Sequence, residues 1–185
     1  SLEQIIETDD TTKFAFKTRD WHIIEAILMY HRQNEKYVKD DKPKLNRITL
    51  CISSQVGCAM NCLFCVTGKL WFKRDLTREE IISQILFANT YIKKRFWKKE
   101  DGTNHWIRNV VFMGMWEPLL NYENLRKSLE IMLQQDRLSL GKRHITISTC
   151  GVIPWIEKLV KDNIDVKLAI SLHAPNQELR NKITT

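Results

Sequence analysis

The hydrophobic and polar positions divide the chain into an N-terminal stretch of β-type patterning and a longer part in which short apolar runs alternate with helical periodicity. Residues 12–19 alternate with the period of two that is typical of a β-strand, and residues 22–29 form a second β-type run. Asp20 and Trp21 lie between them, which predicts a β-hairpin with a two-residue turn. Residues 31–46 are polar and rich in Lys, as an exposed loop is.

From residue 47 onward, four short apolar runs predict buried parallel strands. They are rich in β-branched residues and nearly unbroken, as strands covered on both faces are. The runs are residues 47–53, 107–113, 144–149 and 165–172.

Helical segments follow these runs. The first begins with the capping-box pair Thr77 and Glu80. Its apolar face is predicted to consist of Ile81, Ile82, Ile85, Leu86 and Ile92. A second helix is predicted near residues 122–135, and a third, short one follows Pro154. The apolar face of the second helix is Leu125, Leu129 and Met132.

Four strand–helix units with right-handed crossovers make about half of an α/β barrel, or a small open sheet. We therefore expect an α/β fold: a partial (βα) barrel with about four βα units, preceded by a β-hairpin. Residues 1–46 are expected to form the hairpin extension and a basic loop, and residues 47–185 the barrel core.

The composition is that of a folded protein with excess positive charge. Of 185 residues, 43% are hydrophobic and 28% are charged, which excludes a disordered chain. No run approaches the roughly 18 apolar residues of a membrane span, and residues 1–20 lack a signal-peptide core. We expect a cytoplasmic protein with no membrane partner. The net charge is +7, with Lys clusters at 36–44, 93–95 and 98–99, which could neutralise the phosphates of a nucleic acid, although Lys-rich loops are usually only solvated.

Three closely spaced cysteines give the strongest chemical signal. Cys58, Cys62 and Cys65 directly follow the first predicted barrel strand and its exit loop. Thiolates are the preferred ligands of iron–sulfur clusters and of zinc. Structural zinc needs four ligands, and neither Cys51 nor a nearby His has zinc-ribbon spacing to these three. An iron–sulfur cluster is therefore favoured, with zinc or inert buried thiols as the open alternatives.

Several longer motifs resemble one family of enzymes. The cysteine motif has the form Cys-x3-Cys-x-aromatic-Cys, with Phe64 as the aromatic residue. Together with NVVFMGMWEPLLN, HITISTCGVIP and AISLHAPNQELR, it resembles the RlmN/Cfr family of radical S-adenosylmethionine (SAM) RNA adenine methyltransferases, the RlmN branch in particular. The resemblance extends from about residue 12 to residue 183. It implies a partial barrel with a 4Fe-4S cluster, whose open iron chelates SAM for reductive cleavage to a 5′-deoxyadenosyl radical.

The resemblance also assigns roles to single residues. It implies that the cluster ligands are Cys58, Cys62 and Cys65. The positions matching SAM contacts are Trp116, Glu117, Ser148, Ser171, Leu172 and His173. Glu25 matches a general base that deprotonates the methylated adenine, although its strand pattern alone indicates an ordinary solvent-facing residue. Cys51 resembles a redox partner of a methyl-accepting cysteine, and Cys150 matches no ligand and is expected only to pack.

The implied reaction is methylation of C2 of an adenosine in 23S rRNA, and also in tRNA, through a methyl-cysteine intermediate. Methylation of C8 of the same base and a non-catalytic metal-binding RNA module are the alternatives. The implied partners are RNA and an electron donor such as flavodoxin or ferredoxin, with the protein a monomer. The chain starts without Met and stops where a new helix is expected to begin. We therefore expect an incomplete piece that lacks the methyl-accepting cysteine and does not complete methyl transfer alone.

Glycine is scarce and tryptophan abundant. Average usage of roughly 7% predicts about 13 Gly in a chain of this length, whereas there are six Gly and six Trp. Where the resembling family tends to have Gly, this chain has Trp21, Trp71, Trp116 and Trp155. We expect these positions to be UGA codons that the host reads as Gly, with independent substitutions as the alternative.

Overall fold

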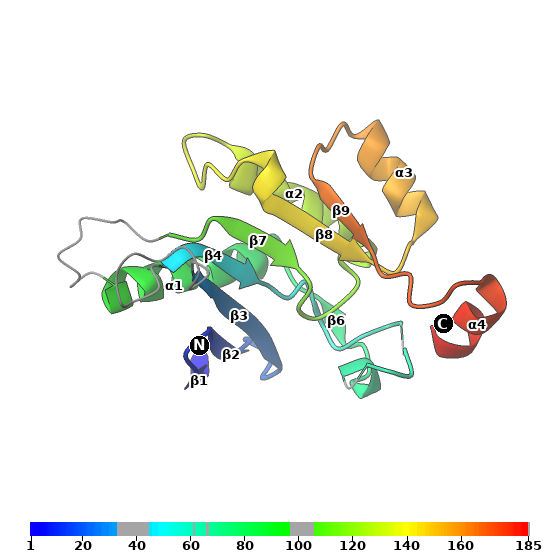
Figure 1. Cartoon of the computed structure of the whole chain (residues 1–185), viewed down its shortest axis with the longest axis horizontal. Helices are drawn as coiled ribbons and strands as arrows, with labels where there is room; N and C mark the ends of the chain where they lie inside the picture. Colours follow the sequence, from blue (N-terminus) through cyan, green and yellow to red (C-terminus); the bar gives the residue numbers. More distant parts are fainter. Residues whose placement is uncertain (33–44, 61, 66, 97–105, 185) are drawn as a thin grey trace.

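The computed structural model describes residues 1–32, 45–60, 62–65, 67–96 and 106–184 (Figure 1). Most of the predicted basic loop and of the Lys-rich segment after the first helix therefore lie outside the described residues. Within these ranges, the main sheet has seven strands in the order β1-β2-β3-β4-β7-β8-β9. No described helix combines the length and the apolar composition needed to cross a bilayer.

The main sheet is made of β1 Leu2–Glu7, β2 Thr11–Lys17, β3 Ile23–Arg32, β4 Leu45–Cys51, β7 Asn109–Phe112, β8 Ile145–Thr149 and β9 Lys167–Ile170. A second, small sheet pairs β5 Gln55–Val56 with β6 Arg74–Asp75. The helices are α1 Arg78–Phe96, α2 Tyr122–Leu133, α3 Ile153–Lys161 and α4 Gln177–Ile183. Short 3₁₀ turns are η2 Thr67–Lys69, η3 Pro118–Asn121 and η4 Lys142–His144.

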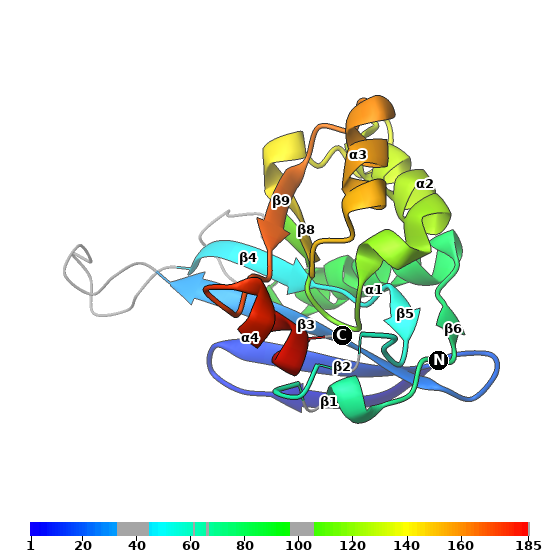
Figure 2. The same cartoon turned by 90° about the vertical axis from the view of Figure 1, so that its right-hand side faces the viewer.

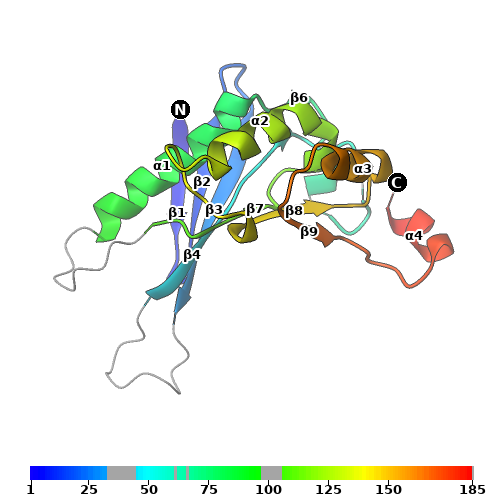
Figure 3. The ribbon, with the colours of Figure 1, turned by 90° about the horizontal axis from the view of Figure 1, so that it is seen from above.

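The predicted partial barrel is confirmed. Strands β4, β7, β8 and β9 pair in parallel, and each is followed by a helix within the described part of the chain. Helices α1, α2 and α3 lie on one face of this sheet (Figure 3). The strand β3 of the hairpin pairs antiparallel with β4, so the hairpin extends the barrel sheet. The domain boundary at residue 46 stays a prediction.

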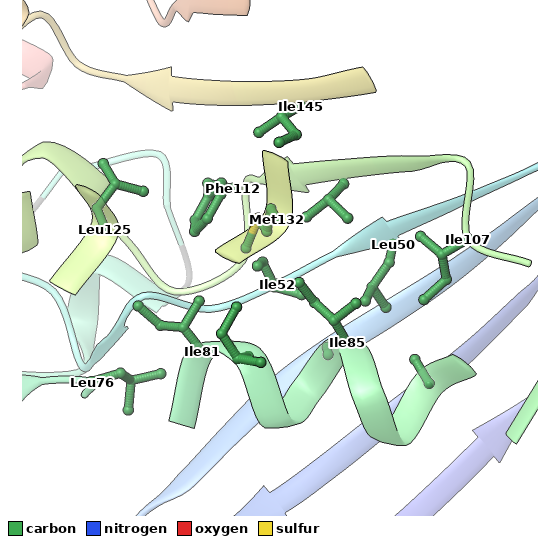
Figure 4. Packing of buried hydrophobic residues seen from close by; sticks show 14 of the residues in the cluster. Leu50, Ile52, Leu76, Ile81, Ile85, Ile107, Phe112, Leu125, Met132 and Ile145 are labelled. Carbon is green, nitrogen blue, oxygen red and sulfur yellow. The ribbon is translucent and has the colours of Figure 1, made fainter. Parts of the chain in front are cut away.

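The core lies between the sheet and the helices α1 and α2 (Figure 4). On α1, Ile81, Ile85 and Ile92 are fully buried, as the periodicity predicts. The prediction for Leu86 is wrong, because this side chain is 51% exposed. At 3.6 residues per turn, Leu86 lies about 140° around the helix from Ile81 and therefore faces solvent. The predicted face of α2 is buried throughout.

The prediction that β9 is buried is also wrong. Leu168 and Ile170 are 39% and 50% exposed. The strand is at the edge of the sheet as described and pairs with β8 on one side. Its following helix, α4, lies apart from the helix layer (Figure 3) and starts at Gln177, earlier than the new helix expected at the chain's end. The side chain of Asn176 accepts a hydrogen bond from Leu179 N at 2.9 Å and caps this start.

The predicted hairpin of β2 and β3 is confirmed, but its turn is wider than two residues. Thr18 N donates to His22 O at 2.9 Å, and Trp21 N donates to Thr18 O at 3.3 Å. Of the two central residues, Trp21 alone has a positive φ, of 69°. This matches a three-residue hairpin loop that needs one left-handed residue at its end. Strand β1, which pairs with β2, was not predicted.

Arg74 attaches the hairpin turn to the start of α1. Its guanidinium donates two hydrogen bonds of 2.7 Å to the Asp20 carboxylate and also bonds both oxygens of Glu80. Glu80 completes the predicted capping box with Thr77. The Arg74 hydrogen bonds lower the pKa of Asp20 and of Glu80. Because both pKa values fall on folding, this stabilisation is present above the ordinary carboxyl pKa and is lost as the pH drops through the lowered values.

Replacing Trp21 by Gly should stabilise the protein by about 0.5–1 kcal/mol. The bulky residue is held in the left-handed region, which glycine adopts without strain. The 76% exposed indole contributes little burial, and its contact with Lys17 Nζ, 4.4 Å from the ring centroid, is a small loss. Urea unfolding measures the change.

The matched control is Trp155→Gly. Trp155 stacks on Tyr122 with ring centroids 5.0 Å apart and lies within α3. Its loss should destabilise by more than about 2 kcal/mol, from lost packing and the low helix propensity of Gly. Equal destabilisation by both variants would contradict the strain at Trp21.

Candidate active site

A pocket of about 320 Å³ lies where the parallel strands end. Such a position is where active sites of α/β barrels are found. Eight of the ten predicted site residues line it: Cys58, Cys62, Cys65, Trp116, Glu117, Ser148, Ser171 and His173. Leu172, 62% exposed, and Glu25 do not. The pocket also contains Cys150, Thr149 and Gly114, which sequence reasoning did not assign to it.

Residues 57–73 connect β5 to β6 and carry Cys58, Cys62 and Cys65. We call this segment the cysteine loop. Gly57 at its start has φ +74°, and a Cβ there would lie 2.0 Å from the carbonyl oxygen of Trp71. Only glycine allows this close approach. Cys58 N donates to Leu70 O at 2.8 Å, which closes the base of the loop. The far side of the loop lies beside α4 (Figures 1 and 2).

Buried polar side chains fix the chain between β4 and the cysteine loop. The amide of Gln84 accepts from Ser53 N and donates to Ser53 O, both at 3.0 Å. Asn121 Nδ2 donates to the carbonyls of Ser54 and Leu76, both at 2.7 Å. Each of these residues is almost fully buried, so a backbone N–H or C=O left without a hydrogen-bond partner here would reduce the stability of the fold.

The thiols surround one side of the pocket. Cys58 Sγ accepts from Met60 N at 3.2 Å, and the Cys150 thiol donates a hydrogen bond to Cys62 Sγ. Burial raises the pKa of Cys62, and burial together with the Glu117 carboxylate raises the pKa of Cys150 to about 12. Cys150 is therefore a protonated donor at neutral pH.

The donor set fits a thiolate-bound iron–sulfur cluster, because three cysteines from one short loop share one pocket. Within the part of the chain that the structure describes, no three His, Cys, Asp or Glu side chains are gathered closely enough to hold a metal ion.

Glu117 forms the polar wall of the pocket and is only 3% exposed. Its Oε2 accepts from Cys150 N at 2.7 Å and its Oε1 from Leu119 N at 3.1 Å, which caps η3. No ion pair to Glu117 is found among the described residues. A buried carboxylate with backbone donors and no cation favours a cationic ligand group.

The ends of β8 and β9 also contribute to the pocket lining. The hydroxyls of Ser148 and Ser171 lie 3.4 Å apart. His173 has φ 55°, and its ring centroid lies 4.4 Å from that of Phe64 in the cysteine loop. These residues thus bring the strand ends and the cysteine loop together.

Trp116 is part of the pocket lining. Its indole Nε1 is buried and has no hydrogen-bond partner within the described structure. A buried unpaired donor costs about 1–3 kcal/mol. Neighbouring Gly114 is tightly enclosed, since a Cβ there would lie 2.6 Å from Ile52 O.

Glu25 lies on β3, outside the pocket lining. Lys13 Nζ is 2.5 Å from its Oε1, and its side chain is about one-third exposed. Ser53 Oγ donates to Glu25 O at 2.6 Å and accepts from Met115 N at 3.0 Å. This hydroxyl joins the hairpin to the residue before Trp116. Cys51 is buried on β4, and burial raises its pKa to about 11.

Comparisons with known proteins show the family to which this chain is related. The sequence profile of the Radical SAM superfamily matches residues 52–185. A probable dual-specificity RNA methyltransferase RlmN of Dictyoglomus thermophilum is 43% identical over 94% of this chain and 44% of its own length. A ribosomal RNA large subunit methyltransferase N of Nitrosopumilus maritimus is 39% identical over 98% of the chain and 48% of its own length.

A solved structure is also similar. The crystal structure of a radical SAM methyltransferase from Sphaerobacter thermophilus matches with a TM-score of 0.83 and 34% identity, over 99% of this chain and 48% of that protein. The chain thus spans a little under half the length of these relatives.

Proposed function

Since the chain belongs to the radical SAM superfamily, we propose that it forms the cofactor-binding part of an RNA adenine methyltransferase. The observation that carries this proposal is the pocket in which Cys58, Cys62 and Cys65 face Glu117 and the two serines. Three thiols against a buried carboxylate and hydroxyls suit a cluster on one side and a SAM amino acid group on the other.

Within this proposal, Cys58, Cys62 and Cys65 hold a 4Fe-4S cluster. When bound, the cluster supplies the electron for reductive cleavage of SAM. The Glu117 carboxylate attracts the positively charged groups of SAM, and the hydroxyls of Ser148 and Ser171 bind its polar groups. The ring of His173, held against Phe64, closes the pocket on the side of the cysteine loop.

The proposed substrate is RNA, with methylation of C2 of an adenosine in 23S rRNA and in tRNA. The printed names of the curated relatives, which describe RNA and dual-specificity RNA methyltransferases, support it. The net charge of +7 suits a polyanionic partner. A flavodoxin or ferredoxin as electron donor and a monomeric state belong to the same proposal.

Glu25 is proposed as the general base. Lys13 keeps its carboxylate oriented, and the Ser53 hydrogen bond ties its backbone to the pocket segment at Met115. A carboxylate in this position can accept the proton that the methylated adenine loses.

The cluster is tested by anaerobic reconstitution with iron and sulfide. Cys58→Ala, Cys62→Ala and Cys65→Ala should each lose the iron absorbance and the SAM-dependent change in the EPR spectrum, because each removes a ligand. Cys51→Ala is the matched control, since its buried thiol lies outside the pocket, and it should retain iron. Stoichiometric zinc without iron in the wild type would refute the cluster.

Glu25→Gln should leave SAM cleavage intact in the full-length enzyme but slow release of methylated RNA by about 10²–10⁴-fold, the usual contribution of a general base. A protein–RNA adduct should accumulate and is measured by mass spectrometry. Glu3→Gln, an exposed carboxylate on β1, is the control and should turn over normally. Normal turnover of Glu25→Gln would show that this residue has no catalytic role. If the wild-type product carried its methyl group at C8 of the adenine, the proposed methylation at C2 would be wrong.

Trp116→Gly should bind SAM about tenfold more tightly than the sequence as given. An indole in the pocket lining takes space that SAM would need, and overpacking costs about 1–3 kcal/mol, while 1.4 kcal/mol corresponds to tenfold in affinity. Trp106→Gly, an exposed residue outside the pocket, should leave affinity unchanged in calorimetry. Equal SAM affinity for wild type and Trp116→Gly would show that the indole moves aside.

Peptide sequencing from the natural host tests the UGA hypothesis directly, since Trp at residue 116 would disprove it there.

A further inference from the structure

Arg180, on α4, contacts the ends of two neighbouring strands at once. Its guanidinium donates to Ser171 O at 3.0 Å and also to the carbonyls of Leu172 and Cys150. Cys150 follows β8, and Ser171 and Leu172 follow β9. One side chain therefore binds the main chain on both sides of the pocket's serine wall.

One of the carbonyls that Arg180 binds, that of Leu172, directly precedes a strained residue. His173 has φ 55°, a conformation that non-glycine residues rarely adopt. The carbonyl of Leu172 also accepts from Ala174 N at 2.7 Å, so it is held from two directions. Backbone strain of this kind persists only where surrounding contacts enforce it, and such sites cluster where ligands bind.

The same helix reaches the cysteine loop. Leu63 N donates to Ile183 O at 3.1 Å, at the carboxyl end of α4. The ring of His173 contacts Phe64, the next residue along that loop. Helix α4 thus connects the loop that carries the cysteines with the two strand ends that carry Ser148 and Ser171 (Figure 2).

We propose that Arg180 is a positioning residue for SAM: it holds the ends of β8 and β9 so that Ser148, Ser171 and His173 form one binding wall. The inference rests on the proposed SAM site and adds a residue that does not line the pocket. Arginine is required because its planar fork of five donors can serve three carbonyls together. The single ammonium of lysine cannot match that geometry.

Arg180→Lys keeps the charge and should weaken SAM binding to the reconstituted holoprotein by about 10- to 100-fold, as loss of residues supporting a binding site does. Iron content should stay unchanged, because all three ligand cysteines remain. Arg126→Lys is the matched control, since Arg126 makes ion pairs with Glu123 and Glu130 on the surface of α2, and it should bind SAM normally. Wild-type affinity in Arg180→Lys would overturn the proposal.

A second variant separates positioning from folding. Arg180→Ala should regain SAM affinity when millimolar guanidinium is added, because the free ion can occupy the same carbonyl cluster. Failure of rescue, with the protein folded by circular dichroism, would count against the proposal.

Hydrogen exchange provides a readout that needs neither cluster nor SAM. In cluster-free Arg180→Lys, the amide of Ala174 should exchange faster than in the wild type, because its acceptor carbonyl is no longer held by Arg180. Unchanged exchange would show that Arg180 does not hold the ends of β8 and β9 in place. If the wild type bound no SAM while exchange at Ala174 responded as expected, the proposed function would be wrong. The structural part of the inference, that Arg180 holds the two strand ends, would still be correct.

Discussion

The structure depends on hydrogen-bond partners for the buried backbone groups that follow β4 inside the protein. Ser53 is completely buried there, and its amide and carbonyl are both paired by the side chain of Gln84. Its hydroxyl joins Glu25 in the hairpin to Met115 beside the pocket. The cysteine loop starts four residues later, at Gly57. The hairpin, α1 and the pocket therefore take their relative positions from one residue.

Local sequence signals predicted the parts of the fold whose causes are local. The capping box of Thr77 and Glu80 and the buried face of α2 follow from spacing alone, and both are confirmed. Strand β1 could not be predicted in this way, because all six of its residues are exposed and its pattern shows no buried face. The exposure of β9 is a consequence of its edge position, which its own apolar residues do not encode.

The candidate site was predictable to the extent that strand ends converge. Cys58 follows one predicted parallel strand, and Ser148 and Ser171 are next to last in two others, so their meeting at one edge of the sheet could be anticipated. Contacts between elements that are distant in the sequence could not be predicted. The hydrogen bond from Cys150 to Cys62 and the position of Arg180 depend on how α4 and the cysteine loop dock, and neither leaves a periodic signal. The roles of the predicted site residues stay predictions.

Besides the pairing of β3 with β4, two side-chain contacts hold the hairpin, and they differ in how they respond to dissolved ions. At one end, Arg74 holds Asp20 through charged groups that are 30% and 43% exposed, and dissolved ions screen such a contact. Near the start of β3, the hydrogen bond from Ser53 to Glu25 O is made by a fully buried hydroxyl-bearing residue, and ionic strength hardly affects it. Salt therefore weakens the contact at the tip of the hairpin, whereas the Ser53 hydrogen bond and the pairing of β3 with β4 keep the rest of the hairpin in place.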